Sequence, residues 1–248
     1  MADLIQIPCA GGTAEAYLSR PDDQPRPGVL FFADAIGLRP QIAAMTDRIA
    51  SWGYVVLAPN FFYRDGSIAE LAPRTDLRTP EGRAAFFASG LMERVAALTP
   101  ELSNPDTEVW VAELGRRAGR PIGTTGYCMG ARLAVRAAAA HPDLVAAVGG
   151  FHGGGLVTDK PDSPHLALSA ARAEFVFGHA DNDQSMPAEA VAALGVALTG
   201  AGLVHRNEIY PGAVHGYTMA DMSAYDEESA ERHFTVLREL FERRLPAA

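Results

Sequence analysis

The segment Gly126-Tyr127-Cys128-Met129-Gly130 decides the fold of this chain, because it places a cysteine between a predicted strand and a predicted helix. The residues before it, 120–125, end in small and β-branched types that favour a strand. The residues after it, 131–140, are rich in alanine and favour a helix. A sharp strand-to-helix turn with glycine two positions before and two after its central residue is typical of a nucleophile elbow. We therefore predict that Cys128 projects above a sheet as a nucleophile, the alternative being a small buried apolar residue.

An acid and a histidine follow this turn in the order that a nucleophilic triad requires. Residues 173–178 read as a buried strand, and the carboxylates of Asp181 and Asp183 come directly after it. A second strand, 206–210, leads into a glycine-rich loop that ends at His215. We expect His215 to accept the thiol proton and Asp183 to orient the imidazole. Asp181 is the rival acid, and capping of the following helix is the alternative role of Asp183.

These segments resemble the dienelactone hydrolase family, the cysteine branch of the α/β-hydrolases. The stretches that carry the resemblance lie between about residues 28 and 217 and are 33–37, 53–60, 126–130, 182–187 and 210–217. The resemblance implies an α/β-hydrolase fold and cofactor-free hydrolysis of activated carboxylic esters or enol lactones through a thioester. It also favours Asp183 over Asp181, since residues 183–187 match the acid turn of the family. No metal is implied.

The oxyanion of a tetrahedral intermediate needs preorganised donors, and two backbone N–H groups are expected to supply them. One is the N–H of Met129, directly after the nucleophile, and the other is that of Ala35, in the loop after the predicted strand 28–32. The same loop contains Asp34. The family commonly has a glutamate there that pairs with the resting thiol, so Asp34 is a possible thiol partner; a loop-bonding role is the alternative.

The expected substrate pocket has aromatic walls and lacks one of the arginines with which the family binds the substrate carboxylate. The resemblance places an arginine four residues after the catalytic histidine, where this chain has Met219. Arg74, Arg78 or Arg83 are candidates for a second carboxylate contact. Together these features favour a less anionic substrate than dienelactone. The pocket candidates are Phe62, Tyr127, Phe151, His152, Tyr217 and Met219, each of which has plain core packing as its alternative.

Strand and helix patterns alternate along all 248 residues, which predicts one α/β-hydrolase domain over residues 1–248. Two N-terminal strands, 4–8 and 13–19, predict an antiparallel hairpin joined through Gly11-Gly12. From residue 28 onward, continuous apolar strands predict a mostly parallel sheet with helices on both faces. The predicted helices are 40–52, 81–98, 105–118, 130–140, 188–201 and 224–243.

The composition of the chain restricts which binding partners and which cellular compartment we expect. A formal net charge of −9 disfavours binding to nucleic acid and to anionic membranes. The N-terminus has no basic region followed by an apolar run, and no stretch reaches the roughly 18 apolar residues of a membrane span. Two cysteines argue against a disulfide framework and suit a reducing cytoplasm. We expect a soluble cytoplasmic protein with a small-molecule ester or lactone substrate. Its oligomeric state is left open, with a monomer favoured.

Several alternatives compete with this interpretation. Thiolate leaves a tetrahedral adduct more readily than alkoxide does, which favours enol lactones, aryl esters and thioesters over alkyl esters. A thioester or acyl hydrolase without lactone preference is therefore the second candidate. A non-catalytic α/β-hydrolase fold that binds a ligand is a third. A metal site at His179, Asp181 and Asp183 lacks the spacing of a zinc motif, and a redox role lacks a second cysteine near Cys128.

Overall fold

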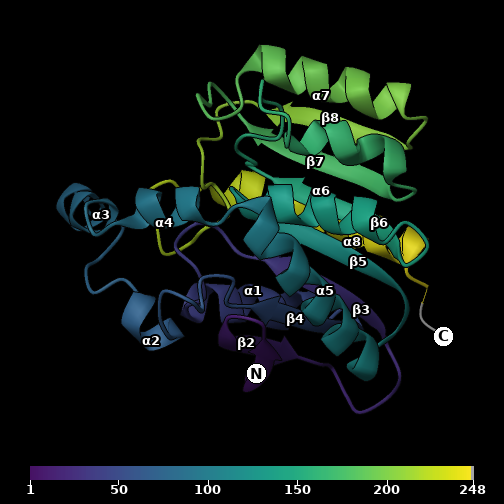
Figure 1. Ribbon diagram of the computed structural model, residues 1–248. Helices are drawn as coiled ribbons and strands as arrows, with labels where there is room; N and C mark the ends of the chain where they lie inside the picture. Colours follow the sequence, from purple (N-terminus) through teal and green to yellow (C-terminus); the bar gives the residue numbers. More distant parts are fainter. Residues whose placement is uncertain (247–248) are drawn as a thin grey trace.

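The strands of residues 1–246, the part that the computed structural model describes, form one eight-stranded sheet in the order β1-β2-β4-β3-β5-β6-β7-β8 (Figure 1). The pairs β1–β2 and β2–β4 are antiparallel, and all the others are parallel. The predicted α/β-hydrolase architecture, a mostly parallel sheet with an N-terminal hairpin, is confirmed. The strands are β1 Asp3–Cys9, β2 Gly12–Ser19, β3 Pro27–Phe32, β4 Val55–Pro59, β5 Gly119–Tyr127, β6 Val145–Phe151, β7 Glu174–Ala180 and β8 His205–Tyr210.

The burial of each strand follows from its place in the sheet. In β2, Ala14, Ala16 and Leu18 are buried at every second position, as expected where one face of a strand packs on the core. The central strands β3 and β4 are buried at every residue, because helices cover both faces of the sheet there. This difference explains why the first strands alternate in sequence and the central ones read as apolar runs.

Helices pack on both faces of the sheet. Neighbouring residues of a strand point to opposite faces. A Cβ added at Gly149 of β6 would meet Leu237 of α8, whereas one added at Gly150 would lie 3.6 Å from Ala131 of α6, so α6 and α8 cover opposite faces. The helices are α1 Pro40–Ala50, α2 Ile68–Leu71, α3 Pro80–Phe87, α4 Leu91–Ala97, α5 Pro100–Arg117, α6 Gly130–Ala140, the 3-10 helix η1 Pro164–Ala170, α7 Ala188–Gly200 and α8 Glu227–Arg244.

The helix predictions differ from the structure mainly in the segment before β5. The predicted helix 81–98 is two helices, α3 and α4, because the chain turns at Gly90, whose φ of 86° is left-handed. Helix α5 begins at Pro100 rather than at residue 105, and it contains Pro105. Proline at the first helical position is favourable, since its missing N–H has no acceptor there. Helices α2 and η1 were not predicted. No helix of residues 1–246 is long and apolar enough to cross a membrane.

Candidate active site

Cys128 lies at a tight turn between β5 and α6 with a φ of 53°, a value that non-glycine residues rarely adopt. The two flanking glycines make this turn possible. A Cβ at Gly126 would lie 2.3 Å from the carbonyl oxygen of Gly130, and one at Gly130 would lie 2.3 Å from that of Ala33. Both distances are shorter than any real contact of such atoms. The turn thus has the backbone and close packing of a nucleophile elbow, and it directs the Cys128 side chain into a cavity at the carboxyl end of the strands.

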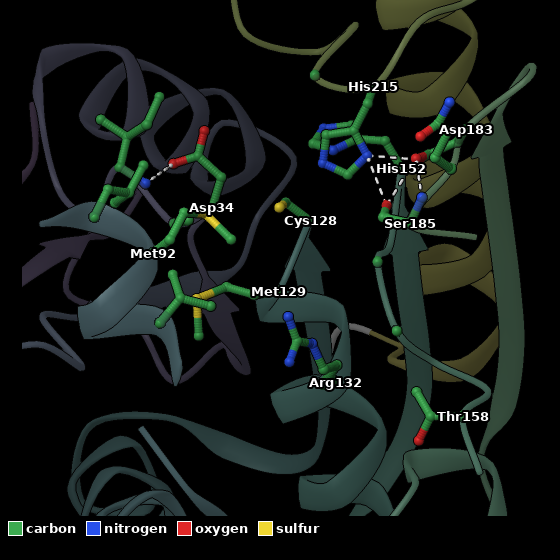
Figure 2. Close-up of a pocket in the computed structure, with 18 of the residues that line it drawn as sticks. Asp34, Met92, Cys128, Met129, Arg132, His152, Thr158, Asp183, Ser185 and His215 are labelled. Carbon is green, nitrogen blue, oxygen red and sulfur yellow. Dashed lines mark hydrogen bonds and ion pairs between the residues drawn. The ribbon is translucent and has the colours of Figure 1, made fainter. Parts of the chain in front are cut away.

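His215 and Asp183 meet beside this turn. The loop after β8 carries His215, and its Nδ1 donates a hydrogen bond of 2.6 Å to Oδ2 of Asp183, which follows β7. The other carboxylate oxygen of Asp183 accepts from the backbone N–H and the hydroxyl of Ser185, at 2.8 and 2.7 Å. The Cys128 thiol lies between the His215 ring and the wall that carries Asp34 and Met92 (Figure 2). The sequence-predicted nucleophile, base and acid therefore lie together at one cavity.

Asp181, the rival acid, is held away from His215. Its Oδ2 accepts from the backbone N–H of Gly212 at 2.9 Å, so it ties the end of β7 to the loop that carries His215. His179 is buried and its Nε2 bonds to Asn207 at 2.7 Å. Residues 179, 181 and 183 bond to different partners, and within residues 1–246 no three His, Cys, Asp or Glu side chains are grouped so that they could hold a metal ion.

The electrostatics of the pair suit proton transfer. Burial lowers the pKa of His215, but the hydrogen bond to Asp183 and the interaction of the ring with the Cys128 sulfur outweigh it and raise this pKa to about 10. Burial likewise opposes ionisation of Asp183, yet its hydrogen bonds with His215 and Ser185 lower the pKa of this carboxyl. The imidazole is therefore protonated at neutral pH, which places an imidazolium beside the sulfur.

Two backbone N–H groups are free to bind an oxyanion. Ala35 follows β3 in a turn closed by a hydrogen bond of 3.0 Å from the N–H of Gly37 to the carbonyl of Asp34. Met129 follows Cys128 at the start of α6. Within residues 1–246 neither the Ala35 nor the Met129 N–H donates to another protein atom, and both residues line the cavity. Unpaired donors on two sides of a nucleophile are the feature that an oxyanion hole needs.

Asp34 lines the cavity, but its carboxylate is occupied by Arg39 rather than by the thiol. The buried guanidinium of Arg39 donates to both oxygens of Asp34, at 2.7 and 2.9 Å, and also to Asp221, at 2.6 and 3.2 Å. The Asp34 carboxylate additionally accepts from the N–H of Ile36 at 3.1 Å. These contacts correspond to the loop-bonding alternative for Asp34, because a carboxylate held on both oxygens is not available to the sulfur.

The cavity has a volume of about 870 Å³, and its walls differ from the aromatic ones that the sequence suggested. Among the six pocket candidates, only His152 lines it. Tyr127 and Phe151 pack instead against His233, at centroid distances of 5.7 and 4.7 Å, on the face of the sheet that α8 covers. The other three, Phe62, Tyr217 and Met219, are buried in the core. Since Met219 is fully buried and does not line the cavity, its apolar side chain is no evidence for a less anionic substrate.

Sequence reasoning missed three parts of this cavity. Ser185 holds Asp183, although the acid-turn segment that contains it was singled out. Helix α4, which falls within the predicted helix 81–98, supplies an apolar wall of Leu91, Met92 and Val95. Arg132 lies one helical turn after Cys128 and also lines the cavity. The signal that could have identified Arg132 is its place in the first turn of the predicted helix 130–140, four residues after the nucleophile.

Comparisons with known proteins show which family this chain resembles. The family model described as "Dienelactone hydrolase family" matches residues 14–245. An Escherichia coli K12 protein, provisionally named as a carboxymethylenebutenolidase, is 28% identical over 256 residues, which cover 97% of this chain and 86% of that protein. A mouse protein named "Carboxymethylenebutenolidase homolog" is 25% identical over 206 residues, covering 82% and 75%.

Solved structures show the same fold. A crystal structure from Klebsiella pneumoniae, provisionally titled as a dienelactone hydrolase, superposes with a TM-score of 0.82 at 23% identity and covers 98% of both chains. A dienelactone hydrolase from Anabaena variabilis superposes with a TM-score of 0.61 at 19% identity, covering 99% of this chain and 98% of that one.

Proposed function

Because the chain belongs to the dienelactone hydrolase family, we propose that it hydrolyses activated carboxylic esters or enol lactones with Cys128 as nucleophile. The observation that carries the proposal is the hydrogen bond of His215 to Asp183 beside an elbow cysteine, all three lining one cavity. Its substrate is a small molecule, and a soluble cytoplasmic enzyme of one domain is the setting that we expect.

The reaction follows from the placement of these groups. The Cys128 sulfur attacks the acyl carbon, and the N–H groups of Ala35 and Met129 receive the developing oxyanion. The bond to the leaving oxygen breaks, and the His215 imidazolium gives that oxygen its proton. Water then attacks the thioester while His215 takes a proton from it, releasing the acid and regenerating Cys128. Asp183 orients the ring and balances its charge throughout.

The leaving group decides which esters react. Thiolate departs more readily than alkoxide, so an adduct with an alkyl ester collapses back to substrate. Enolate, phenolate and thiolate leaving groups avoid that reversal. We therefore expect aryl esters, enol lactones and thioesters to be turned over faster than alkyl esters of the same acid, and a panel that includes dienelactone tests this order.

Replacing the nucleophile tests the proposal. We expect Cys128→Ala to lower kcat/KM for 4-nitrophenyl acetate by about 10³-fold or more. Mass spectrometry of quenched wild-type enzyme should show one added acyl group on Cys128. The matched control is Cys9→Ala, at the end of β1, which should keep wild-type activity. Retention of more than a tenth of the activity in Cys128→Ala would exclude Cys128 as the nucleophile.

A further inference from the structure

The last strand of the sheet, β8, pairs with β7 on one edge and with no other strand of residues 1–246. The carbonyl of Val204 accepts from the N–H of Phe175 at 2.9 Å, which identifies the side of the β8 backbone that faces β7. Backbone groups alternate in direction from one residue of a strand to the next, so those of His205, Asn207 and Ile209 point outward. In the described part of the chain these outward N–H and C=O groups form no hydrogen bond. Such an edge is a template for pairing with another strand.

Helix α7 is largely uncharged on the side that faces solvent. It lies with β8 at the end of the sheet opposite the N-terminal hairpin (Figure 1). Glu189 is its only charged residue, and Val196 is 73% exposed. In a protein with a formal net charge of −9, a helix without a charged face is typical of one that another protein surface covers. The exposed residues of α7 are Ala188, Glu189, Ala192, Ala193, Val196, Thr199 and Gly200.

The uncharged side of α7 reaches the free edge of β8. Nδ2 of Asn207 donates to the carbonyl of Val191 at 2.8 Å, and a Cβ at Gly195 would lie 3.2 Å from the same nitrogen. The turn of α7 that holds residues 191 and 195 therefore lies on β8. Successive helix residues are rotated by about 100°, so Ala192 and Thr199 come next around the helix on this side. Because β8 is the last strand, these positions lie toward the free edge.

The free backbone groups of β8 fit a second copy of the same strand. In an antiparallel pair, two residues that face each other with their backbone groups can exchange both N–H···O bonds. If the pairing is centred on Asn207, this residue faces Asn207 of the other copy, and His205 faces Ile209 in both directions. All the outward groups of the three residues are then paired. A symmetric contact of this kind closes after two copies.

The charges of β8 are complementary in the same register. Arg206 donates to Glu208 at 2.6 Å, and Glu208 also accepts from Arg232 at 2.8 Å, so these side chains lie on the face that α8 covers. Antiparallel pairing centred on Asn207 places Arg206 of each copy opposite Glu208 of the other. Centring it on residue 206 or 208, or pairing the strands in parallel, would place like charges side by side, which is unfavourable. The charge pattern therefore selects one register of self-pairing.

We propose that the edge of β8 and the exposed side of α7 bind a second copy of this chain, joining two sheets into one. The strands pair antiparallel about Asn207. Since α7 lies beside β8 on one face of the sheet, the α7 helices of the two protomers meet across the symmetry axis. Alanine at position 192 allows a close approach there, and Val196 supplies apolar area. This interface goes beyond the proposed hydrolysis and does not depend on it.

A charge exchange tests the register. By sedimentation equilibrium at micromolar concentration, the wild type should have twice the 26.3 kDa mass of the chain. Arg206→Glu and Glu208→Arg should each raise the Kd of the dimer tenfold or more, because each places like charges opposite each other. The double variant should return to within about threefold of wild type. An equimolar mixture of the two single variants should form heterodimers, since opposite charges then face each other.

The matched control for these variants is Arg26→Glu, which changes the net charge equally at an exposed ion pair far from β8 in the sequence. It should leave the Kd within twofold. Urea unfolding of each variant checks that it is folded. A wild-type monomer would overturn the proposal, and so would a dimer that both single variants retain unchanged. A mixture of the single variants that stays monomeric would also overturn it.

The contact of α7 needs a separate variant. Val196→Glu should raise the Kd tenfold or more, because it buries a charge between the helices. The matched control is Leu4→Glu in β1, which is 56% exposed at the opposite edge of the sheet and should have no effect. Dissociation by Leu4→Glu but not by Val196→Glu would assign the dimer to the edge of β1 and refute the proposed interface.

Discussion

At the scale of single residues, the proposed activity depends on a proton that His215 holds more tightly than a free imidazole does. Its pKa of about 10 exceeds the ordinary value of 6.5, chiefly because Asp183 and the Cys128 sulfur outweigh the effect of burial. A histidine in this state is a proton donor at neutral pH and a counter-ion for a thiolate. The hydrogen bond of 2.6 Å between Nδ1 and Asp183 also keeps Nε2 directed at the cavity.

Removing the charge of Asp183 should therefore lower the pKa of His215. We expect Asp183→Asn to move the titration of the His215 ring, followed by NMR, from about 10 toward 6.5. The alkaline limb of kcat/KM should move in the same direction, since the imidazolium must protonate the leaving group. The matched control is Asp181→Asn, because Asp181 bonds to Gly212 and not to His215. An equal shift in both variants would contradict the assignment of Asp183 as the orienting acid.

At the scale of elements, the elbow depends on close contact between β3, β5 and α6. Gly130 opens α6 directly against the end of β3, where a Cβ would lie 2.3 Å from the carbonyl oxygen of Ala33 and 2.4 Å from that of Phe32. Both atoms belong to the backbone, so they cannot move away cheaply. Ala35 follows β3 and Met129 precedes α6, and both residues line the cavity, so we expect this contact to hold the two proposed oxyanion donors in place.

Gly130→Ala should consequently damage both stability and catalysis. Overpacking of this kind costs about 1–3 kcal/mol of unfolding free energy, measurable by urea denaturation. Displacing an oxyanion donor by a fraction of an ångström should lower kcat/KM by tenfold or more. Gly115→Ala in α5 is the matched control, because a Cβ there meets nothing within 4 Å. That variant should gain about 0.5–1 kcal/mol from helix propensity. A Gly130→Ala protein as stable and active as wild type would show that the contact is not required.

At the scale of the whole molecule, a buried ion network joins regions that lie far apart in the sequence. Arg39 precedes α1 and pairs with Asp34 after β3 and with Asp221, in the segment between β8 and α8. The loop of Ala35, the proposed oxyanion donor, is thereby connected to the segment that follows His215. Arg39 and Asp34 are both almost fully buried, so each charge depends on the other.

Arg39→Met should leave Asp34 buried without a counter-ion and cost about 3–5 kcal/mol in urea unfolding. Adding Asp34→Asn should restore part of that loss, since it removes the uncompensated charge. The control is Arg238→Met on α8, whose ion pair with Glu242 is more than half exposed on both sides. Exposed pairs contribute about 0–1 kcal/mol, so little change is expected. If Arg39→Met and Arg238→Met proved equally mild, the network would not be a structural link.

The sequence by itself determined most of the strands and helices and their order. The buried runs of β3, β5 and β7, the hairpin at Gly11-Gly12 and the helix after Gly130 follow from local periodicity and from glycine at tight turns. The elbow at Cys128 could also be predicted from local sequence, because its glycines lie two residues to either side. The order of cysteine, acid and histidine also placed three residues at the carboxyl ends of parallel strands, which share one edge of the sheet.

Only the tertiary structure decided what surrounds those residues. Tyr127 and Phe151 are next to site residues in sequence, but strand alternation turns them toward α8, away from the cavity. Asp34 pairs with Arg39, whereas Arg132 has no hydrogen-bond partner within residues 1–246. Both outcomes depend on which groups the fold brings together from distant parts of the chain. Local patterns record whether a side chain is buried. Which charge it meets depends on how the loops pack over the sheet, and that packing assigns the carboxylate of Asp34 to Arg39 and leaves Arg132 facing the cavity.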